Sequence, residues 1–94
     1  MFQDNLFEDK IALVTGGRSG IGFTVAKQYL QLGARVVVAS RKQDALEAAA
    51  KELSEFGSCD AVACDIRDTE QVAQLAEQIG EKHGRLDILV NNAG

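Results

Sequence analysis

The sequence predicts an α/β fold in which a parallel sheet carries helices on both faces. Strand-like and helix-like segments alternate along the chain in the order β-α-β-α-β-α-β. The connections are short, and none of the 94 residues is proline, so nothing interrupts a predicted helix or strand. Because parallel strands need a crossover between them, this alternation implies right-handed crossover helices packed on the sheet.

Four short segments are the predicted strands. They cover residues 11–14, 35–40, 60–65 and 86–90. The first is a continuous apolar run, which is typical of a strand buried on both faces, and the second is a short, β-branched run that we also expect to be buried.

Three amphipathic helices are predicted between the strands, over about residues 20–32, 43–56 and 69–83, and a glycine directly follows each of them. Asp68 is the expected N-cap of the third helix, with Gln71 at the capping-box position. Each helix has an apolar face at helical spacing. These faces are, in chain order, Ile21, Val25 and Tyr29; Leu46, Ala49, Ala50 and Leu53; and Val72, Leu75, Ala76 and Ile79.

The composition is that of a globular chain, with 46% hydrophobic and 26% charged residues. The net charge of −4 argues against a nucleic-acid surface. No apolar run approaches the ~20 residues of a membrane helix, and the first residues carry no secretory signal, so we expect a cytoplasmic location. Six basic and three acidic residues occur through Lys42, against four basic and eleven acidic afterwards. An anion site is therefore expected in the first half.

The two cysteines, Cys59 and Cys64, have neither C-x-x-C spacing nor histidine partners. Thiols at this spacing on one strand lie well beyond disulfide reach. We expect buried free thiols and no metal site.

Ligands of open parallel sheets bind beyond the carboxyl ends of the strands, so the residues there form the candidate site. The first strand leads into Thr15-Gly16-Gly17-Arg18-Ser19-Gly20-Ile21-Gly22. Gly16 permits the sharp reversal out of the strand, and Gly20 and Gly22 leave space for an anion at the helix N-terminus. The loop favours a pyrophosphate, although similar turns also occur where nothing binds.

Ser40 and Arg41 follow the second strand, at the offset where a site for NAD carries Asp or Glu on the ribose 2′-hydroxyl. An arginine suits the 2′-phosphate of NADP, and Arg18 in the glycine loop could approach the same phosphate. The sequence therefore favours NADP(H), with NAD(H) as the alternative. The other interpretation of Arg41 and Lys42 is a solvated helix start.

Polar residues also follow the third and fourth strands. Asp65 can accept a hydrogen bond from an adenine amino group while Ile66 covers the ring, or it can cap backbone amides. The chain then reaches Asn91-Asn92-Ala93-Gly94. Its amides can bond neighbouring backbone while the small pair leaves room for a ribose, or the segment is simply a turn.

Taken together, these segments resemble the short-chain dehydrogenase/reductase family. They are Thr15-Gly16-x-x-x-Gly20-Ile21-Gly22, Asp65-Ile66 and Asn91-Asn92-Ala93-Gly94. The resemblance implies a Rossmann-type sheet with strand order 3-2-1-4, in which residues 1–94 are the N-terminal part of a single NAD(P)-binding domain. It also implies an NADP(H)-dependent oxidoreductase that transfers hydride to or from a carbonyl, an alcohol or an enoyl group.

The resemblance assigns the cofactor contacts position by position. The implied pyrophosphate and ribose loop consists of Gly16, Arg18, Ser19, Gly20, Ile21 and Gly22. The implied readers of the 2′-phosphate are Ser40 and Arg41, and the adenine contacts are Asp65 and Ile66. Asn91, Ala93 and Gly94 are implied to steady the sheet and to line the ribose.

No Tyr-x3-Lys, the catalytic pattern of the family, occurs here, because Gly33 stands four residues after Tyr29. We therefore assign no catalytic residue and expect Tyr29 in the core and His83 solvated or dipole-stabilised at a helix end. The chain is expected to be incomplete, with the catalytic residues and the helices of a homo-oligomer interface beyond residue 94. The alternatives are a non-catalytic nucleotide-binding module and a parallel-sheet domain without a dinucleotide.

The substrate class is also suggested by resemblance. Val38-Ala39-Ser40-Arg41-Lys42 and Asp65-Ile66-Arg67 resemble members that reduce enoyl- or dienoyl-CoA esters, with 3-oxoacyl reductases as the alternative. A small-molecule substrate carried on CoA or on an acyl carrier is thus implied.

Overall fold

The structure, a computed structural model, describes residues 7–16, 20–41 and 43–91. Its elements follow the predicted order. They are β1 (Ile11–Thr15), α1 (Gly20–Gln31), β2 (Arg35–Ser40), α2 (Gln43–Leu53), β3 (Cys59–Ala63), α3 (Thr69–His83) and β4 (Ile88–Asn91). The predicted alternation of strand and helix is therefore confirmed.

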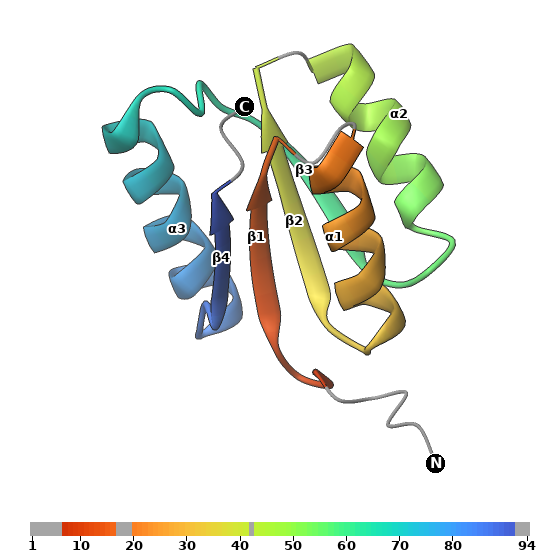
Figure 1. Ribbon diagram of the computed structural model, residues 1–94. Helices are drawn as coiled ribbons and strands as arrows, with labels where there is room; N and C mark the ends of the chain where they lie inside the picture. The colour runs from red at the N-terminus through yellow and green to blue at the C-terminus, as the bar shows by residue number, and fades with distance from the viewer. Residues whose placement is uncertain (1–6, 17–19, 42, 92–94) are drawn as a thin grey trace.

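The four strands form one parallel sheet in the order β3-β2-β1-β4, which confirms the strand order that the resemblance implies. Val14 of the central β1 lies opposite Val38 of β2 on one side and Val90 of β4 on the other. On the far side of β2, Ser40 lies opposite Ala63 of β3. Because the strands are parallel and in this register, their carboxyl ends lie along one edge of the sheet (Figure 1).

Helices α1 and α2 cover one face of the sheet (Figure 1). Alternate residues of β1 and β2 point toward this face, as the period of two in a strand requires. The buried core there consists of Ala12, Val14, Ala26, Leu30, Val36, Val38, Leu46, Ala50 and Leu53. The apolar face predicted for the second helix, Ala49 included, is buried throughout.

The buried positions of α1 differ from the predicted stripe. Ala26 and Leu30 are 0% and 3% exposed, whereas Val25 and Tyr29 are only half-buried. The small side chain of Ala26 allows α1 to approach the sheet closely. Tyr29 packs at the margin of the core, with its ring centroid 5.3 Å from that of Phe7. The prediction that Val25 and Tyr29 face the core is thus correct only in part, and the side chain of Ile21 lies outside the described set.

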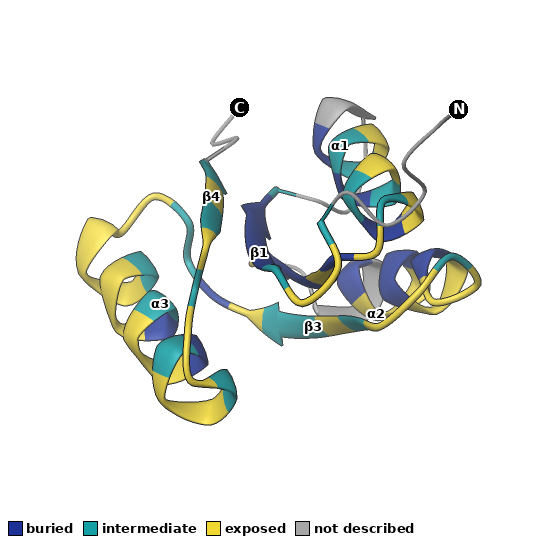
Figure 2. Cartoon of the chain, turned by 90° about the horizontal axis from the view of Figure 1, so that it is seen from below, coloured by how far each residue is buried: buried dark blue, intermediate teal, exposed yellow. Residues whose placement is uncertain are grey.

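Helix α3 covers the opposite face and buries less of its surface (Figure 2). Its buried residues are Leu75 and Ile79, while Val72 and Ala76 are half-buried, so the predicted apolar face is the one that meets the sheet. The strand residues beneath it are Ile11, Leu13, Val37 and Ala39. A cavity of about 210 Å³ remains between α3 and strands β2 and β3.

Several boundaries differ from the prediction at the ends of elements. Helix α2 ends at Leu53 and not at Phe56, since the amide of Phe56 donates to the Leu53 carbonyl in a turn. Strand β3 ends at Ala63 because its pairing with β2 ends there. Gly33 and Gly84 adopt φ angles of 97° and 81° after α1 and α3, as a helix stop requires. Among the described helices, none is long and apolar enough to cross a membrane.

Candidate functional site at the carboxyl edge of the sheet

The register of the sheet brings the predicted site residues to one edge. Thr15, the last residue of β1, lies opposite Ala39 of β2 and Asn91 of β4. The hydroxyl of the buried Thr15 donates to the Val90 carbonyl at 3.3 Å, which ties the ends of β1 and β4 together. Ala63, the last residue of β3, lies opposite Ser40 of β2, so the residues that follow all four strands start from neighbouring points.

Gly16 turns the chain out of β1. Its φ of 72° lies in the left-handed region, which glycine adopts without steric strain, and its amide donates to the Ala39 carbonyl at 2.7 Å. Helix α1 begins at Gly20, so its first turn, with Gly20, Ile21 and Gly22, directly follows this loop. A helix N-terminus attracts anions, because its free amides and its dipole point outward. Arg18 and Ser19, two predicted contacts of the loop, lie outside the described residues.

Ser40 and Arg41 stand at the end of β2 in contrasting environments. Ser40 is 5% exposed, and its carbonyl accepts a hydrogen bond from the amide of Cys64 at 2.8 Å. Arg41 is exposed directly after it. A guanidinium in this position is available to a phosphate, and the neighbouring hydroxyl lies deeper in the fold.

Asp65 and Ile66 follow β3 after the buried Cys64. The Asp65 carboxylate accepts a hydrogen bond from the Arg67 amide at 3.1 Å, so its capping of a backbone amide is confirmed. This amide bond is the largest influence that lowers the pKa of the Asp65 carboxyl. The Arg67 side chain and the charge of Arg41 act in the same direction, against a raising effect of burial. Ile66 is half-buried against the α3-side core.

Asn91 ends β4 opposite Thr15, so the fold brings this predicted residue to the same edge. Its side chain is not described, and Asn92, Ala93 and Gly94 lie outside the described residues. The other predicted contacts of the edge, Gly16, Gly22, Ser40, Arg41, Asp65 and Ile66, are brought together by the sheet.

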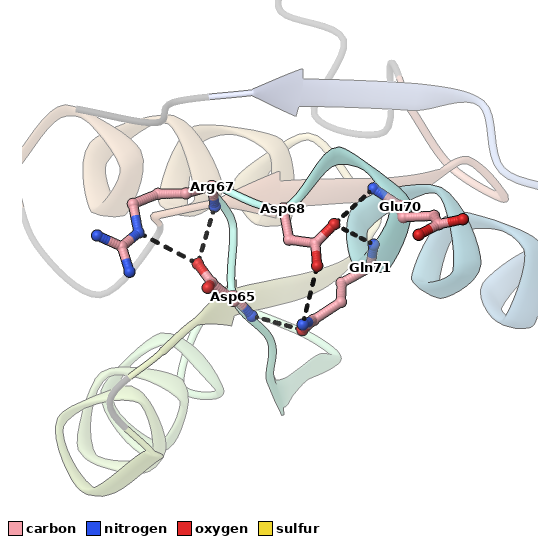
Figure 3. Close-up of polar contacts among 5 residues, drawn as sticks. All are labelled: Asp65, Arg67, Asp68, Glu70 and Gln71. Carbon is pink, nitrogen blue, oxygen red and sulfur yellow. Dashed lines mark hydrogen bonds and ion pairs between the residues drawn. The ribbon is translucent and has the colours of Figure 1, made fainter.

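Gln71 has a different partner from the one its position suggests. Asp68 caps α3 as predicted, since its carboxylate accepts from the amides of Glu70 and Gln71 (Figure 3). A capping box would bring the Gln71 side chain to the Asp68 amide, but that amide donates to the Asp65 carbonyl. The Gln71 carbonyl oxygen accepts instead from the Asp65 amide at 3.0 Å. The capping-box prediction is therefore wrong in its acceptor bond, and Gln71 supports the Asp65 loop.

The two cysteines and His83 give this edge no further reactive group. Burial, followed by the charge of Asp60, raises the pKa of the half-buried Cys59 thiol to about 11, and burial also raises that of Cys64. Both thiols are free, and both are protonated near neutral pH. His83 ends α3 and is half-buried. Within the described ranges, no group of three His, Cys, Asp or Glu residues could hold a metal ion.

The chain is similar to a known protein family and to several of its named members. A family model described as short chain dehydrogenase matches residues 10–94. A 3-oxoacyl-[acyl-carrier-protein] reductase of rhamnolipid biosynthesis from Pseudomonas aeruginosa is 46% identical over 90% of this chain and 33% of its own length. The peroxisomal 2,4-dienoyl-CoA reductase of Danio rerio is 36% identical over 99% of this chain and 32% of its own.

Solved structures also match the fold. A Pseudomonas aeruginosa RhlG/NADP active-site complex has a TM-score of 0.88 and 42% identity, over 100% of this chain and 37% of that one. The chain spans about a third of the length of the curated relatives described above.

Proposed function

Because this chain belongs to the short chain dehydrogenase family, we propose that it is the cofactor-binding part of an NADP(H)-dependent oxidoreductase. Residues 1–94 are then the N-terminal part of a single dinucleotide-binding domain. One observation carries the proposal. A glycine turn before a helix N-terminus, an exposed arginine and an ionised carboxylate follow β1, β2 and β3 along the same sheet edge.

The described residues fit a dinucleotide that carries a 2′-phosphate. Gly16 carries no side chain at the turn out of β1, and the N-terminus of α1, which follows this loop, is the kind of site that attracts a pyrophosphate. Ser40 and Arg41 stand at the offset where a site for NAD carries Asp or Glu, whose carboxylate would repel a 2′-phosphate. The Asp65 carboxylate is an acceptor for an adenine amino group. The proposed site also includes Arg18, Ser19, Gly20, Ile21, Gly22, Ser40, Ile66, Asn91, Ala93 and Gly94.

The bound dinucleotide supplies or accepts a hydride, and the residues of this chain hold and orient it. We propose that the hydride moves to or from a carbonyl, alcohol or enoyl group of a small molecule. An acyl thioester is the proposed substrate class, because relatives include a reductase of 3-oxoacyl-[acyl-carrier-protein] and a 2,4-dienoyl-CoA reductase. A homo-oligomer is the proposed assembly.

The decisive measurement is the affinity of the protein that carries this chain for NADPH and NADH, by isothermal titration calorimetry. We expect NADPH to bind more tightly. Arg41→Asp should weaken NADPH binding by roughly 10–100-fold, the usual range for a hydrogen bond to a charged group, and leave NADH binding nearly unchanged. Arg35→Asp is the matched control, since Arg35 is an exposed arginine at the opposite end of β2.

Three results separate the alternatives. Equal weakening by Arg35→Asp would make the effect one of overall charge and contradict the assignment of Arg41. Binding of NADPH without turnover of any acyl thioester would support a non-catalytic nucleotide-binding module. If neither dinucleotide binds, the proposed function is wrong.

A further inference from the structure

The Asp65 carboxylate uses its two oxygens unequally. Oδ1 accepts hydrogen bonds from the Arg67 amide at 3.1 Å and from the Arg67 Nε at 3.4 Å (Figure 3). In the described part of the chain, Oδ2 has no donor. The side chain is 35% exposed, so Oδ2 can receive a donor from a ligand at the sheet edge.

The backbone of Asp65 is held as firmly as its side chain. Its amide donates to the Gln71 side chain at 3.0 Å, and its carbonyl accepts from the Asp68 amide at 3.0 Å. The Gln71 side-chain amide in turn donates to Asp68 Oδ2 at 3.3 Å. Since Asp68 also caps α3, the loop is tied to the first turn of a 15-residue helix. The orientation of the Asp65 carboxylate then depends mainly on Arg67.

Arg67 is not explained by a contribution to stability. Its side chain is 66% exposed, and an exposed ion pair of two residues on one loop stabilises a fold little. In Figure 3 its guanidinium points away from α3. Its bonds engage Oδ1 from two directions, and they keep the carboxylate ionised, because they lower its pKa.

We infer that Arg67 is a positioning residue for nucleobase selection, which rests on the proposed dinucleotide function. By occupying Oδ1, Arg67 leaves Oδ2 as a single, oriented acceptor. An adenine can donate its exocyclic amino group to this oxygen. Hypoxanthine carries a carbonyl oxygen at the same position, so two acceptors would face each other, and the base is rejected.

The experiment compares binding of NADPH with that of its deaminated analogue, nicotinamide hypoxanthine dinucleotide phosphate. The protein that carries this chain should prefer NADPH by about tenfold or more. Arg67→Gln should bring the ratio of the two affinities several-fold closer to one, because Asp65 Oδ1 then loses its Nε donor and keeps only the backbone amide of residue 67, which holds the carboxylate less firmly. Arg67→Lys keeps the charge but lacks the Nε donor, and it should give an intermediate ratio.

The matched control is Arg85→Gln. Arg85 bonds an aspartate two residues away, as Arg67 does, but it lies ahead of β4, at the opposite end of the sheet. Its loss changes the net charge by the same amount and should leave the ratio unchanged.

A second measurement is the pH dependence of the ratio of the two affinities. If Arg67 had only a structural role, its replacement would not change this pH dependence. Adenine preference requires the ionised Asp65 carboxylate, so it should disappear in acid. Arg67→Gln removes a side-chain donor and a positive charge that lower the pKa of this carboxyl. The preference should therefore be lost at a higher pH in Arg67→Gln than in the parent protein.

The outcomes distinguish this inference from the proposed function. If the parent protein does not bind NADPH, the proposed function fails, and the inference fails with it. If it binds NADPH and the hypoxanthine analogue equally, or if Arg67→Gln leaves their ratio unchanged, the inference is overturned while the proposed function stands. Equal weakening of both dinucleotides by Arg67→Gln would also overturn it, because Arg67 would then act as a general cation.

Discussion

Two aspartate–arginine pairs lie at opposite ends of the sheet and share much of their chemistry. In the loop after β3, Asp65 pairs with Arg67, two residues later, at 3.4 Å. Ahead of β4, Asp87 pairs with Arg85, two residues earlier, at 2.8 Å. The pKa of each carboxyl is lowered by its arginine partner.

The pairs differ in what else the carboxylate reaches. Asp87 Oδ2 accepts from the amide of Ile11 at 2.9 Å, and the amide of Asp87 donates back to the Ile11 carbonyl at 3.0 Å. These bonds join the starts of β1 and β4 across 76 residues of sequence. Among the described residues, the hydrogen-bond donors to the Asp65 carboxylate come from its own loop, and Oδ2 has no donor. An aspartate–arginine pair is therefore structural where its carboxylate also accepts from the amide of a distant strand, as Asp87 does. It can bind a ligand where the donors to the carboxylate belong to its own loop, as at Asp65.

Asp87→Ala should have the largest effect on stability. The substitution leaves the amide of the buried Ile11 without its side-chain acceptor and removes one of the bonds that join the starts of β1 and β4. We expect Tm to fall by several degrees in thermal unfolding followed by circular dichroism. Asp65→Ala is the control at the other end and should lower Tm less. A comparable loss of Tm in both variants would contradict the distinction between the two pairs.

The pH dependence of stability should separate the pairs further. The pKa of the Asp87 carboxyl is lowered from 3.8 in the folded chain, first by the Arg85 side chain and then by the Ile11 amide. A lowered folded-state pKa stabilises the fold above the unfolded pKa, and this contribution is lost as the pH falls through the folded value. Tm should therefore decrease below about pH 5, and Asp87→Asn should flatten this acid limb.

Asp65→Asn should change the acid limb less than Asp87→Asn. Arg67, which donates to the Asp65 carboxylate, is two residues away, so part of this interaction persists in the unfolded chain, whereas the bond of Asp87 to Ile11 is lost on unfolding. A series of melting curves between pH 7 and pH 3 would test this. The idea fails if Asp65→Asn flattens the curve more.

The smallest effects concern the two glycines near the C-terminal end of α3. Gly84 leads into the Arg85–Asp87 pair with a φ of 81°, so Gly84→Ala should destabilise the fold by about 1 kcal/mol through backbone strain, although its Cβ would meet no atom within 4 Å. Gly80 lies inside the helix, and its Cβ would also meet nothing within 4 Å. Gly80→Ala should stabilise the fold by about 0.5–1 kcal/mol. Chemical denaturation of both variants measures the change in the free energy of unfolding. A change of the same sign in the two variants would contradict this account.

Local pattern was sufficient for most of the fold. The continuous apolar run of β1 and the spaced apolar face of α2 predicted elements that the structure reproduces, because burial on both faces of a strand or on one side of a helix leaves a recognisable pattern in the sequence. The stripe of α1 was less predictable. Whether Val25 or Ala26 faces the sheet depends on how closely the helix approaches, and periodicity alone does not contain that distance.

Some features of the candidate site were likewise predictable from the sequence, and others were not. Glycine at position 16, arginine at 41 and aspartate at 65 were identifiable from residue type and from their place after a strand, since the ends of parallel strands meet at one edge. Gln71 was recognised as a capping residue, but its acceptor bond to the Asp65 amide was not foreseen. Arg67 was noted only as part of a resemblance, because an exposed arginine next to aspartates is usually just a solvated surface pair.

The sequence by itself determined which segments are strands and helices, which glycines stop α1 and α3, and which polar residues stand at the strand ends. Those properties depend on residues within a few positions of one another. Only the tertiary structure decided that the Asp87 carboxylate binds the amide of Ile11 and that Asp65 Oδ2 has no donor in the part of the chain that the structure describes. The reason is geometric: hydrogen-bond partners are chosen by distance and direction in space, and the pairing of β1 with β4 sets both for Asp87.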